Sequence, residues 1–362
     1  MKILWFGHRD IGHPMSGGAE RTIQEIARRL VARGDEVTWA SGGFHGCQRN
    51  AQVDGIRVVR ARGYFFAHVD APVLVRSLRP DIVVDDLGHV VPWFSELYSG
   101  LPGTAFFRHL HARTLPGQVA PPFAKSLTWV EQAYPLIYPH WPFVTESRQG
   151  VRDLVQLGID ESRVVQIPPG VDLERFRIEE KSNEPTIVYF GGFRDYKRPW
   201  VPVEVFSRLQ PRVTGLQLQM IGAGPALPIV QRLVRDKGIE GVHFTGRIGV
   251  EALAEIVSRS WVNVHCSMSE GWGYSILEAS ASGTPTVAYA VPGVSETVEP
   301  GVNGILVADR DVDALVDATE SVVLDHAEWI ARSRIFAERF TWDVAANRWR
   351  NHFSAMIAGS SG

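Results

Sequence analysis

The sequence predicts an α/β protein with two domains, each built on a parallel sheet that helices cover on both faces. Three observations support this prediction. The length of 362 residues corresponds to about 2.4 ordinary domains. Short apolar runs alternate with segments of helical periodicity along the whole chain. The order strand, glycine-containing turn, helix opens both halves, and strands separated by helices imply right-handed crossovers within a parallel sheet.

The first half contains the clearest alternation. Residues 19–33 place Ile23, Ile26 and Leu30 on one face, which predicts an amphipathic helix, and Gly34 suits the end of that helix. The other helices are predicted at 73–78 and 147–156. The predicted strands are 3–7, 36–40, 56–61, 81–84, 104–107 and 142–146.

A change in composition marks the domain boundary. Pro168-Pro169-Gly170 is followed by a short charged run at 179–185, so the hinge is predicted between residues 171 and 184. The predicted domains are therefore 1–171 and 172–340.

The second half repeats the theme and ends in a separate helix. The predicted strands are 186–190, 216–221, 242–245, 262–266, 286–288 and 304–307, and the predicted helices are 200–209, 227–237, 251–258 and 274–282. The segment 342–357 is amphipathic. We predict that 341–362 forms a helix that packs back on the first domain.

Composition excludes several classes of protein. Hydrophobic residues make up 45% and the formal net charge is −3, so a disordered chain and a general nucleic-acid binder are both disfavoured. The two cysteines, Cys47 and Cys266, cannot build a disulfide framework and favour a reducing, cytoplasmic compartment. The sequence has no apolar run of 18 residues that predicts a membrane-spanning helix, and the apolar start is too short for a signal peptide.

The most informative stretch is 269–285, which follows a predicted strand. Glu270 lies in a glycine-containing loop, and Glu278 lies eight positions later in the next helix. Amides at the start of a helix stabilise an anion such as a diphosphate, and a carboxylate one or two turns later can accept two hydrogen bonds from a ribose diol. A surface glutamate and a helix salt bridge are the structural alternative, which the surrounding glycines disfavour.

This stretch resembles the E-x7-E signature of the family 4 retaining glycosyltransferases, which use nucleotide sugars. Further segments match in the same order: 17–21, 143–147, 167–172, 196–199, 221–225 and 244–247. The resemblance covers nearly the whole chain. It implies the GT-B fold, in which two Rossmann-like, doubly wound domains face a central cleft.

The resemblance also implies roles for individual residues. Glu270 corresponds to the glutamate that contacts the donor sugar, Glu278 to the ribose glutamate, and Lys197 to the lysine that neutralises the diphosphate. The family's arginine is absent, because its position is Gly192, and either Arg194 or Arg198 is expected to supply the charge. The predicted donor-binding residues are Gly17, Gly18, Lys197, Arg198, Gly222, Arg247, Glu270, Gly271, Trp272, Gly273, Tyr274, Ser275 and Glu278.

A histidine pair follows the strand at 104–107. The family carries a functional histidine in this loop, and His111 is favoured over His109, although both stay candidates. The predicted catalytic residues are His111, His109, Glu270, Lys197 and Arg194. Asp85 and Asp86 are adjacent and would point to opposite sides of a strand, so no metal site and no cofactor are predicted.

The aromatic and proline-rich segment 114–142 has three interpretations: a lid over the acceptor, a surface at the inner face of a membrane, or an ordinary packed insertion. The predicted function is transfer of a sugar to a hydroxyl of a lipid-linked, saccharide or small-molecule acceptor with retention of configuration. The alternatives are a sugar-nucleotide epimerase or phosphorylase with the same architecture, and a non-enzymatic nucleotide-sugar sensor.

Overall fold

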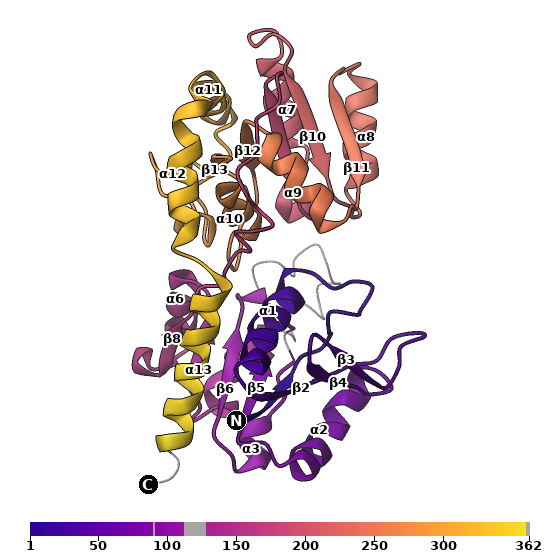
Figure 1. Ribbon diagram of the computed structural model, residues 1–362, viewed down its shortest axis with the longest axis vertical. Helices are drawn as coiled ribbons and strands as arrows, with labels where there is room; N and C mark the ends of the chain where they lie inside the picture. The colour runs from indigo at the N-terminus through magenta and orange to yellow at the C-terminus, as the bar shows by residue number, and fades with distance from the viewer. Residues whose placement is uncertain (90, 112–127, 360–362) are drawn as a thin grey trace. The chain divides into compact units, whose positions relative to one another are not determined.

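The computed structural model describes residues 1–89, 91–111 and 128–359, and the chain divides into two compact units (Figure 1). Unit 1 consists of Met1–Gly170 together with Trp342–Gly362, and unit 2 is Val171–Thr341. Each unit is described by itself. Among the described helices, none is both long enough and apolar enough to cross a bilayer.

Unit 1 is built on an eight-stranded sheet with the order β3-β4-β2-β1-β5-β6-β7-β8. The strands are β1 (Lys2–Phe6), β2 (Glu36–Ser41), β3 (Asn50–Val53), β4 (Ile56–Arg60), β5 (Ile82–Asp86), β6 (Gly103–Phe107), β7 (Phe143–Thr145) and β8 (Val164–Gln166). Strand β3 pairs antiparallel with β4, whereas the other pairings are parallel. Leu4 of β1 stands between Thr38 and Val83, which places β1 and β5 at the centre.

Helices cover both faces of this sheet. They are α1 (Gly18–Ala32), α2 (Tyr64–Leu78), α3 (Ser95–Ser99), α5 (Tyr134–Ile137), α6 (Arg148–Gln156) and α13 (Trp342–Gly359), with a 3-10 turn η2 (Glu161–Arg163). The C-terminal helix α13 packs beside α1 and against the sheet, where the ring centroids of Trp349 and of Trp5 on β1 lie 5.0 Å apart. The Arg350 guanidinium also donates to Asp35 at 2.9 Å. The terminal helix therefore completes the core of unit 1.

Unit 2 has a six-stranded parallel sheet with the order β11-β10-β9-β12-β13-β14. The strands are β9 (Thr186–Phe190), β10 (Gln217–Ile221), β11 (Val242–Gly246), β12 (Val262–His265), β13 (Thr286–Tyr289) and β14 (Gly304–Val307). The helices are α7 (Val201–Leu209), α8 (Leu227–Asp236), α9 (Val250–Arg259), α10 (Tyr274–Ala281), α11 (Val312–Leu324) and α12 (His326–Glu338), with 3-10 turns η3 (Asp195–Lys197) and η4 (Val294–Glu296).

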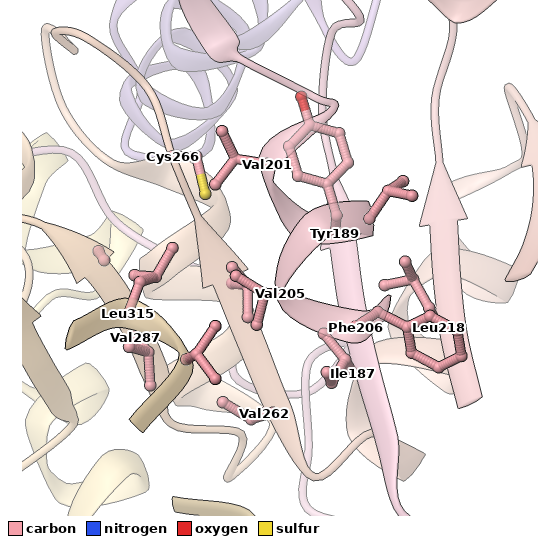
Figure 2. Packing of buried hydrophobic residues seen from close by; sticks show 14 of the residues in the cluster. Ile187, Tyr189, Val201, Val205, Phe206, Leu218, Val262, Cys266, Val287 and Leu315 are labelled. Atoms are coloured by element: carbon pink, nitrogen blue, oxygen red, sulfur yellow. The ribbon is translucent and has the colours of Figure 1, made fainter. Parts of the chain in front are cut away.

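The core of unit 2 follows from the alternation of side chains along β9. Ile187 and Tyr189 point to one face, where Figure 2 shows them among residues of α7 and α11 such as Phe206 and Leu315. Val188 and Phe190 point to the other face, where they pack with the α9 and α10 side. Both faces are apolar because both are covered, as expected for a parallel sheet.

The structure confirms the predicted alternation and differs at several elements. Helix α2 begins at Tyr64 rather than at residue 73. The sequence pattern missed its first turns because they expose apolar side chains such as Phe65, which breaks the amphipathic pattern. The edge strands β3 and β8 and the helices α11 and α12 were missed. Residues 171 and 341 belong to unit 2, because they form a β-bridge and the Val171 amide donates to Phe340 at 2.9 Å.

Candidate active site

Most of the predicted site residues of unit 2 lie along the carboxyl edge of its sheet. Strand β9 lies between β10 and β12. The chain passes from β9 to β10 and β11 on one side of it, and then crosses to β12 on the other side. In open α/β sheets such a switch point leaves a crevice between the loops that follow the two strands. The loop after β9 carries Lys197, and the loop after β12 carries Glu270.

Glycines let the first of these loops pack against its neighbour. Gly222 has φ +132°, and a Cβ there would lie 1.9 Å from the Gly191 carbonyl oxygen. At Gly224 a Cβ would lie 2.4 Å from the Phe193 carbonyl oxygen. The Phe193 amide donates to Ala223 at 3.0 Å. Only glycine fits at positions 222 and 224, because the two loops meet backbone to backbone.

Lys197 and Glu270 form an ion pair across the switch point. Their side chains are only 19% and 11% exposed. Burial raises the pKa of Glu270, but the Lys197 charge and the nearby His265 outweigh it and hold that pKa well below its ordinary value. Burial likewise lowers the pKa of Lys197, and the Glu270 charge reverses the shift so that it ends above the ordinary value. Both groups are therefore charged near neutral pH.

His265, the last residue of β12, is a third member of this site that the sequence prediction missed. Its Nε2 lies 3.2 Å from Glu270 Oε1 without an aligned hydrogen bond between them. Its Nδ1 lies 3.3 Å from the Ser275 hydroxyl. The sequence could have indicated His265, because it ends a predicted central strand and directly precedes the loop that carries Glu270.

The loop that carries Glu270 is fixed by its neighbours. The Glu270 amide donates to the Pro292 carbonyl at 3.0 Å. Gly293 has φ +79°, and a Cβ there would lie 2.0 Å from the Glu270 carbonyl oxygen. Gly273 lies so close to Thr297 that a Cβ would come within 2.5 Å of its hydroxyl. These contacts hold the start of α10 against the loop.

The amides at the start of α10 are not all available to a ligand. The Tyr274 amide donates to the Trp272 carbonyl at 3.0 Å, so this amide is not free to bind an anion. Trp272 is buried, and its ring lies 5.5 Å from that of Phe340. The Trp272 side chain is therefore packed inside unit 2, whereas Gly271 and Ser275 remain partly accessible.

The structure distinguishes the two arginines that were candidates to replace the arginine absent at Gly192. Arg198 is buried, and its guanidinium donates to both carboxylate oxygens of Asp309, at 2.5 and 3.3 Å. Arg194 is exposed in the loop after β9. A side chain at Gly192 would meet only the Arg194 side chain, at 3.9 Å. Arg198 is buried against Asp309, whereas Arg194 lies exposed on the loop that carries Lys197, so Arg194 is the better placed of the two.

The remaining donor-binding candidates of unit 2 occupy the same edge. Glu278 lies on α10 after Ser275 and is half-buried. Arg247 follows β11 and is exposed. The structure thus gathers on one sheet edge the candidates that the sequence spread over residues 194–278.

In unit 1 the histidine pair lies at the carboxyl end of β6. His111 Nδ1 lies 3.1 Å from Glu131 Oε1, and the His111 amide donates to that same oxygen at 2.7 Å. Its Nε2 faces the Gly88 carbonyl at 3.2 Å. The ring of His109 lies beside it, 4.7 Å between centroids. Glu131, which the sequence did not single out, therefore fixes the orientation of His111.

Buried charges stand behind this loop. Arg108 donates to Asp86 at 3.0 Å and to Glu146 at 2.8 Å. Asp85 points the other way and accepts a hydrogen bond from the Tyr138 hydroxyl at 2.8 Å. In the part of the chain that the structure describes, no group of three or more His, Cys, Asp or Glu side chains could hold a metal ion.

Gly17 and Gly18 mark the start of α1 in unit 1. Gly17 is the N-cap, and its amide donates to the Glu20 carboxylate at 2.7 Å. Both glycines are exposed. Part of the segment 114–142 lies outside the described residues; in its described part, Trp129 is 70% and Leu136 80% exposed.

Two family models match adjoining parts of the chain. The model "Glycosyltransferase Family 4" matches residues 16–175, and the model "Glycosyl transferases group 1" matches residues 171–337. The chain belongs to the family 4 glycosyltransferases. This membership agrees with the resemblance that the glutamate motif predicted.

Two curated relatives of this glycosyltransferase have names that state an activity. It is 30% identical over 202 residues to the GDP-mannose-dependent alpha-(1-6)-phosphatidylinositol monomannoside mannosyltransferase of Mycobacterium tuberculosis, covering 51% of the chain and 52% of that relative. It is 31% identical over 221 residues to the D-inositol 3-phosphate glycosyltransferase of Geodermatophilus obscurus, covering 55% and 49%. The chain spans about half the length of the curated relatives it matches.

Solved structures confirm the fold. Sucrose-phosphate synthase from Thermosynechococcus elongatus superposes with a TM-score of 0.81 at 21% identity, covering 99% of both chains. The Anabaena protein HepE, solved in complex with UDP, gives a TM-score of 0.77 at 15% identity over 98% of this chain and 100% of the other. The predicted GT-B class, with two Rossmann-like domains, is confirmed.

Proposed function

We propose that this protein transfers a sugar from a nucleoside diphosphate to an acceptor hydroxyl with retention of configuration. The observation that carries the proposal is the Lys197–Glu270 ion pair at the switch point of unit 2, in a chain that belongs to the family 4 glycosyltransferases. One member of the pair suits a diphosphate and the other suits sugar hydroxyls. The same loops supply Arg194 and the accessible backbone of Gly271.

The proposed reaction places the donor diphosphate against Lys197 and Arg194. The bond between the anomeric carbon and the diphosphate oxygen breaks, and the acceptor oxygen bonds to the same face of that carbon. The acceptor proton passes to the departing phosphate oxygen. Negative charge grows on the diphosphate as the bond breaks, so cations already in place stabilise the transition state more than the bound donor.

Two further roles belong to this proposal. Glu278 binds the ribose, where its carboxylate can accept two hydrogen bonds from the diol. His111, which Glu131 orients, acts near the sugar and the acceptor. The side-chain cations perform the charge neutralisation that a metal would otherwise supply, so the reaction is proposed to need no metal and no cofactor.

The donor and the acceptor are proposed as classes. The mannosyltransferase relative is named for GDP-mannose, and HepE was solved with UDP, so both nucleotides are candidates. The proposed acceptor is a hydroxyl on a lipid-linked, saccharide or small molecule. Free Cys47 and Cys266 are consistent with a reducing compartment such as the cytoplasm. Exposed Trp129 and Leu136 support peripheral contact with a membrane at its inner face.

A thermal-shift panel of UDP, GDP and ADP tests donor binding. A nucleotide at a hundredfold excess over its Kd should stabilise the protein by about 2.7 kcal/mol. Lys197→Ala should abolish most of that shift, whereas Lys237→Ala, on the exposed end of α8, should leave it intact. No shift with any of the three nucleotides would contradict the proposal.

Turnover distinguishes a transferase from the alternatives. Proton NMR of the product formed from the matching nucleotide sugar should show a retained anomeric configuration, and Lys197→Ala should lower the rate by about 10²–10³ with the fold intact. Conversion of the donor to its epimer without an acceptor would indicate an epimerase. Binding without any turnover on a broad acceptor panel would indicate a sensor.

A further inference from the structure

The Lys197–Glu270 pair poses a problem that the proposed function does not solve. Without a ligand the two charges neutralise one another. If Lys197 moves to a diphosphate, Glu270 stays behind as a mostly buried carboxylate whose cation has left. A buried charge without a partner is costly, so another group must compensate Glu270.

His265 is the group in position to do so. It is only 5% exposed, and its Nε2 has no aligned hydrogen-bond acceptor although Glu270 Oε1 lies 3.2 Å away. Lys197 contacts that same oxygen. A small rotation of either side chain would align the imidazole N–H with the carboxylate once the lysine has left.

The second imidazole nitrogen is linked to the start of α10. Nδ1 lies 3.3 Å from the Ser275 hydroxyl, which can donate to a neutral ring or accept from a protonated one. If the hydroxyl turns to donate to a ligand phosphate, its oxygen becomes an acceptor for an Nδ1 proton. Both nitrogens would then carry protons, one facing Glu270 and the other facing Ser275.

The charged groups around the imidazole favour this protonation. Glu270 faces it from the loop after β12, and Lys197 stands on the other side of that carboxylate, on η3. From α10 it meets Ser275, which is uncharged, with Glu278 further along that helix. On its own strand, Cys266 follows it, and burial raises the pKa of that thiol, so it stays neutral. The departure of Lys197 and the arrival of a diphosphate both add negative potential near the imidazole, which favours its protonated form.

We propose that His265 is a positioning residue that replaces Lys197 as the partner of Glu270, and takes up a proton at Nδ1, when a nucleoside diphosphate draws the lysine away. The proton comes from solvent, and no bond other than N–H forms. The proposal rests on the proposed function, because it requires a diphosphate at Lys197. Its consequence is that donor binding and proton uptake are linked, and that Glu270 keeps its orientation through the exchange.

Calorimetry measures this linkage directly. UDP and GDP are titrated into the protein near pH 7 in HEPES and in Tris, whose different ionisation enthalpies report the number of protons taken up. The wild type should take up as much as about one proton per nucleotide bound. His265→Gln, which keeps an N–H donor but cannot become charged, should bind the nucleotide within a few-fold of wild type and lose that uptake. His243→Gln, an exposed histidine of β11, is the matched control and should retain it.

The outcomes separate the two proposals. No nucleotide binding by the wild type would overturn the proposed function and this inference with it. Binding that Lys197→Ala abolishes, with the same proton uptake in His265→Gln as in wild type, would overturn the inference alone. If His265→Gln does not fold, Ser275→Ala takes its place, because it removes the acceptor for the Nδ1 proton from a partly exposed position. Undiminished uptake in Ser275→Ala would equally refute the proposal.

Discussion

Asp85 should make the stability of unit 1 depend on pH in the direction opposite to most carboxylates. It is fully buried at the end of β5, where its Oδ2 accepts hydrogen bonds from the Tyr138 hydroxyl at 2.8 Å and the Ser95 amide at 3.1 Å. Its Oδ1 is buried without a partner. Burial raises the pKa of Asp85 to about 7, although those hydrogen bonds oppose the shift.

The sign and size of the effect follow from this pKa. An unfolded aspartate has a pKa near 3.8, so between about pH 4 and pH 7 the folded state holds a proton that the unfolded state has lost. The stabilisation is complete below pH 4 and is lost as the pH rises through about 7. A shift of about 3 units corresponds to about 4 kcal/mol between the two limits.

Asp85→Asn tests this reasoning because asparagine keeps the shape and cannot ionise. Its amide oxygen can accept from Tyr138 and Ser95, and its NH₂ replaces the carboxylic O–H. We expect the variant to be more stable than wild type at pH 8 and similar near pH 4, because only there is the unfolded carboxyl also protonated. For a unit of this size, 4 kcal/mol corresponds to a Tm difference of about 10 °C.

Scanning calorimetry from pH 4 to pH 8 supplies the measurement. The Tm of the wild type should fall more steeply with pH than that of Asp85→Asn. Asp236→Asn, on an exposed position of α8, should follow the wild type. If the curves of wild type and Asp85→Asn run parallel, Asp85 is ionised in the folded protein and the argument from burial is wrong.

Four further predictions concern the candidate site. Glu278→Ala should raise the donor KM much more than it lowers kcat, because ribose contacts are made equally in the ground and transition states; an unchanged KM in steady-state kinetics would leave Glu278 a structural residue. Gly192→Arg should fold normally, since a Cβ there meets only a side chain at 3.9 Å, and should restore activity to Arg194→Ala; failure of this rescue would show that the charge is not needed there. Gly222→Ala should lower the free energy of unfolding by roughly 2–4 kcal/mol, because its Cβ would clash with the Gly191 carbonyl. Urea titration measures this loss, with Gly192→Ala as the control variant. Addition of EDTA should leave turnover unchanged, and loss of activity with rescue by Mg²⁺ would contradict metal independence.

Much of the fold could be read from local pattern. Strand β9 is an almost continuous apolar run that ends in a glycine-containing loop, and the helical period of α7 follows that loop. Helix α2 resisted this approach, since Phe65 and Phe66 are exposed and no apolar face emerges from its spacing. The edge strand β3 is too short and too polar to stand out from a loop.

The sequence predicted a site residue only where that residue lies in a recognisable local motif. Glu270 and Lys197 were found from their motifs, and the structure brings them into contact although 73 positions separate them. His265 and Asp309 were missed, because their importance depends on pairing with residues far away in sequence. Arg198 looked equivalent to Arg194 in the sequence, and the structure distinguishes it by its burial and by its ion pair to Asp309.

Unit 1 is made from two pieces of chain, since α13 completes it from residues 342 onward while unit 2 is continuous. During synthesis the ribosome releases all of unit 2 before the segment that covers Trp5 has been made. Unit 2 can therefore fold first, although it comes second in the sequence. Unit 1 must wait with part of one sheet face uncovered, and contacts such as Trp5 with Trp349 give it a high contact order that slows folding. A nascent chain stopped before residue 342 should need a chaperone to protect that face.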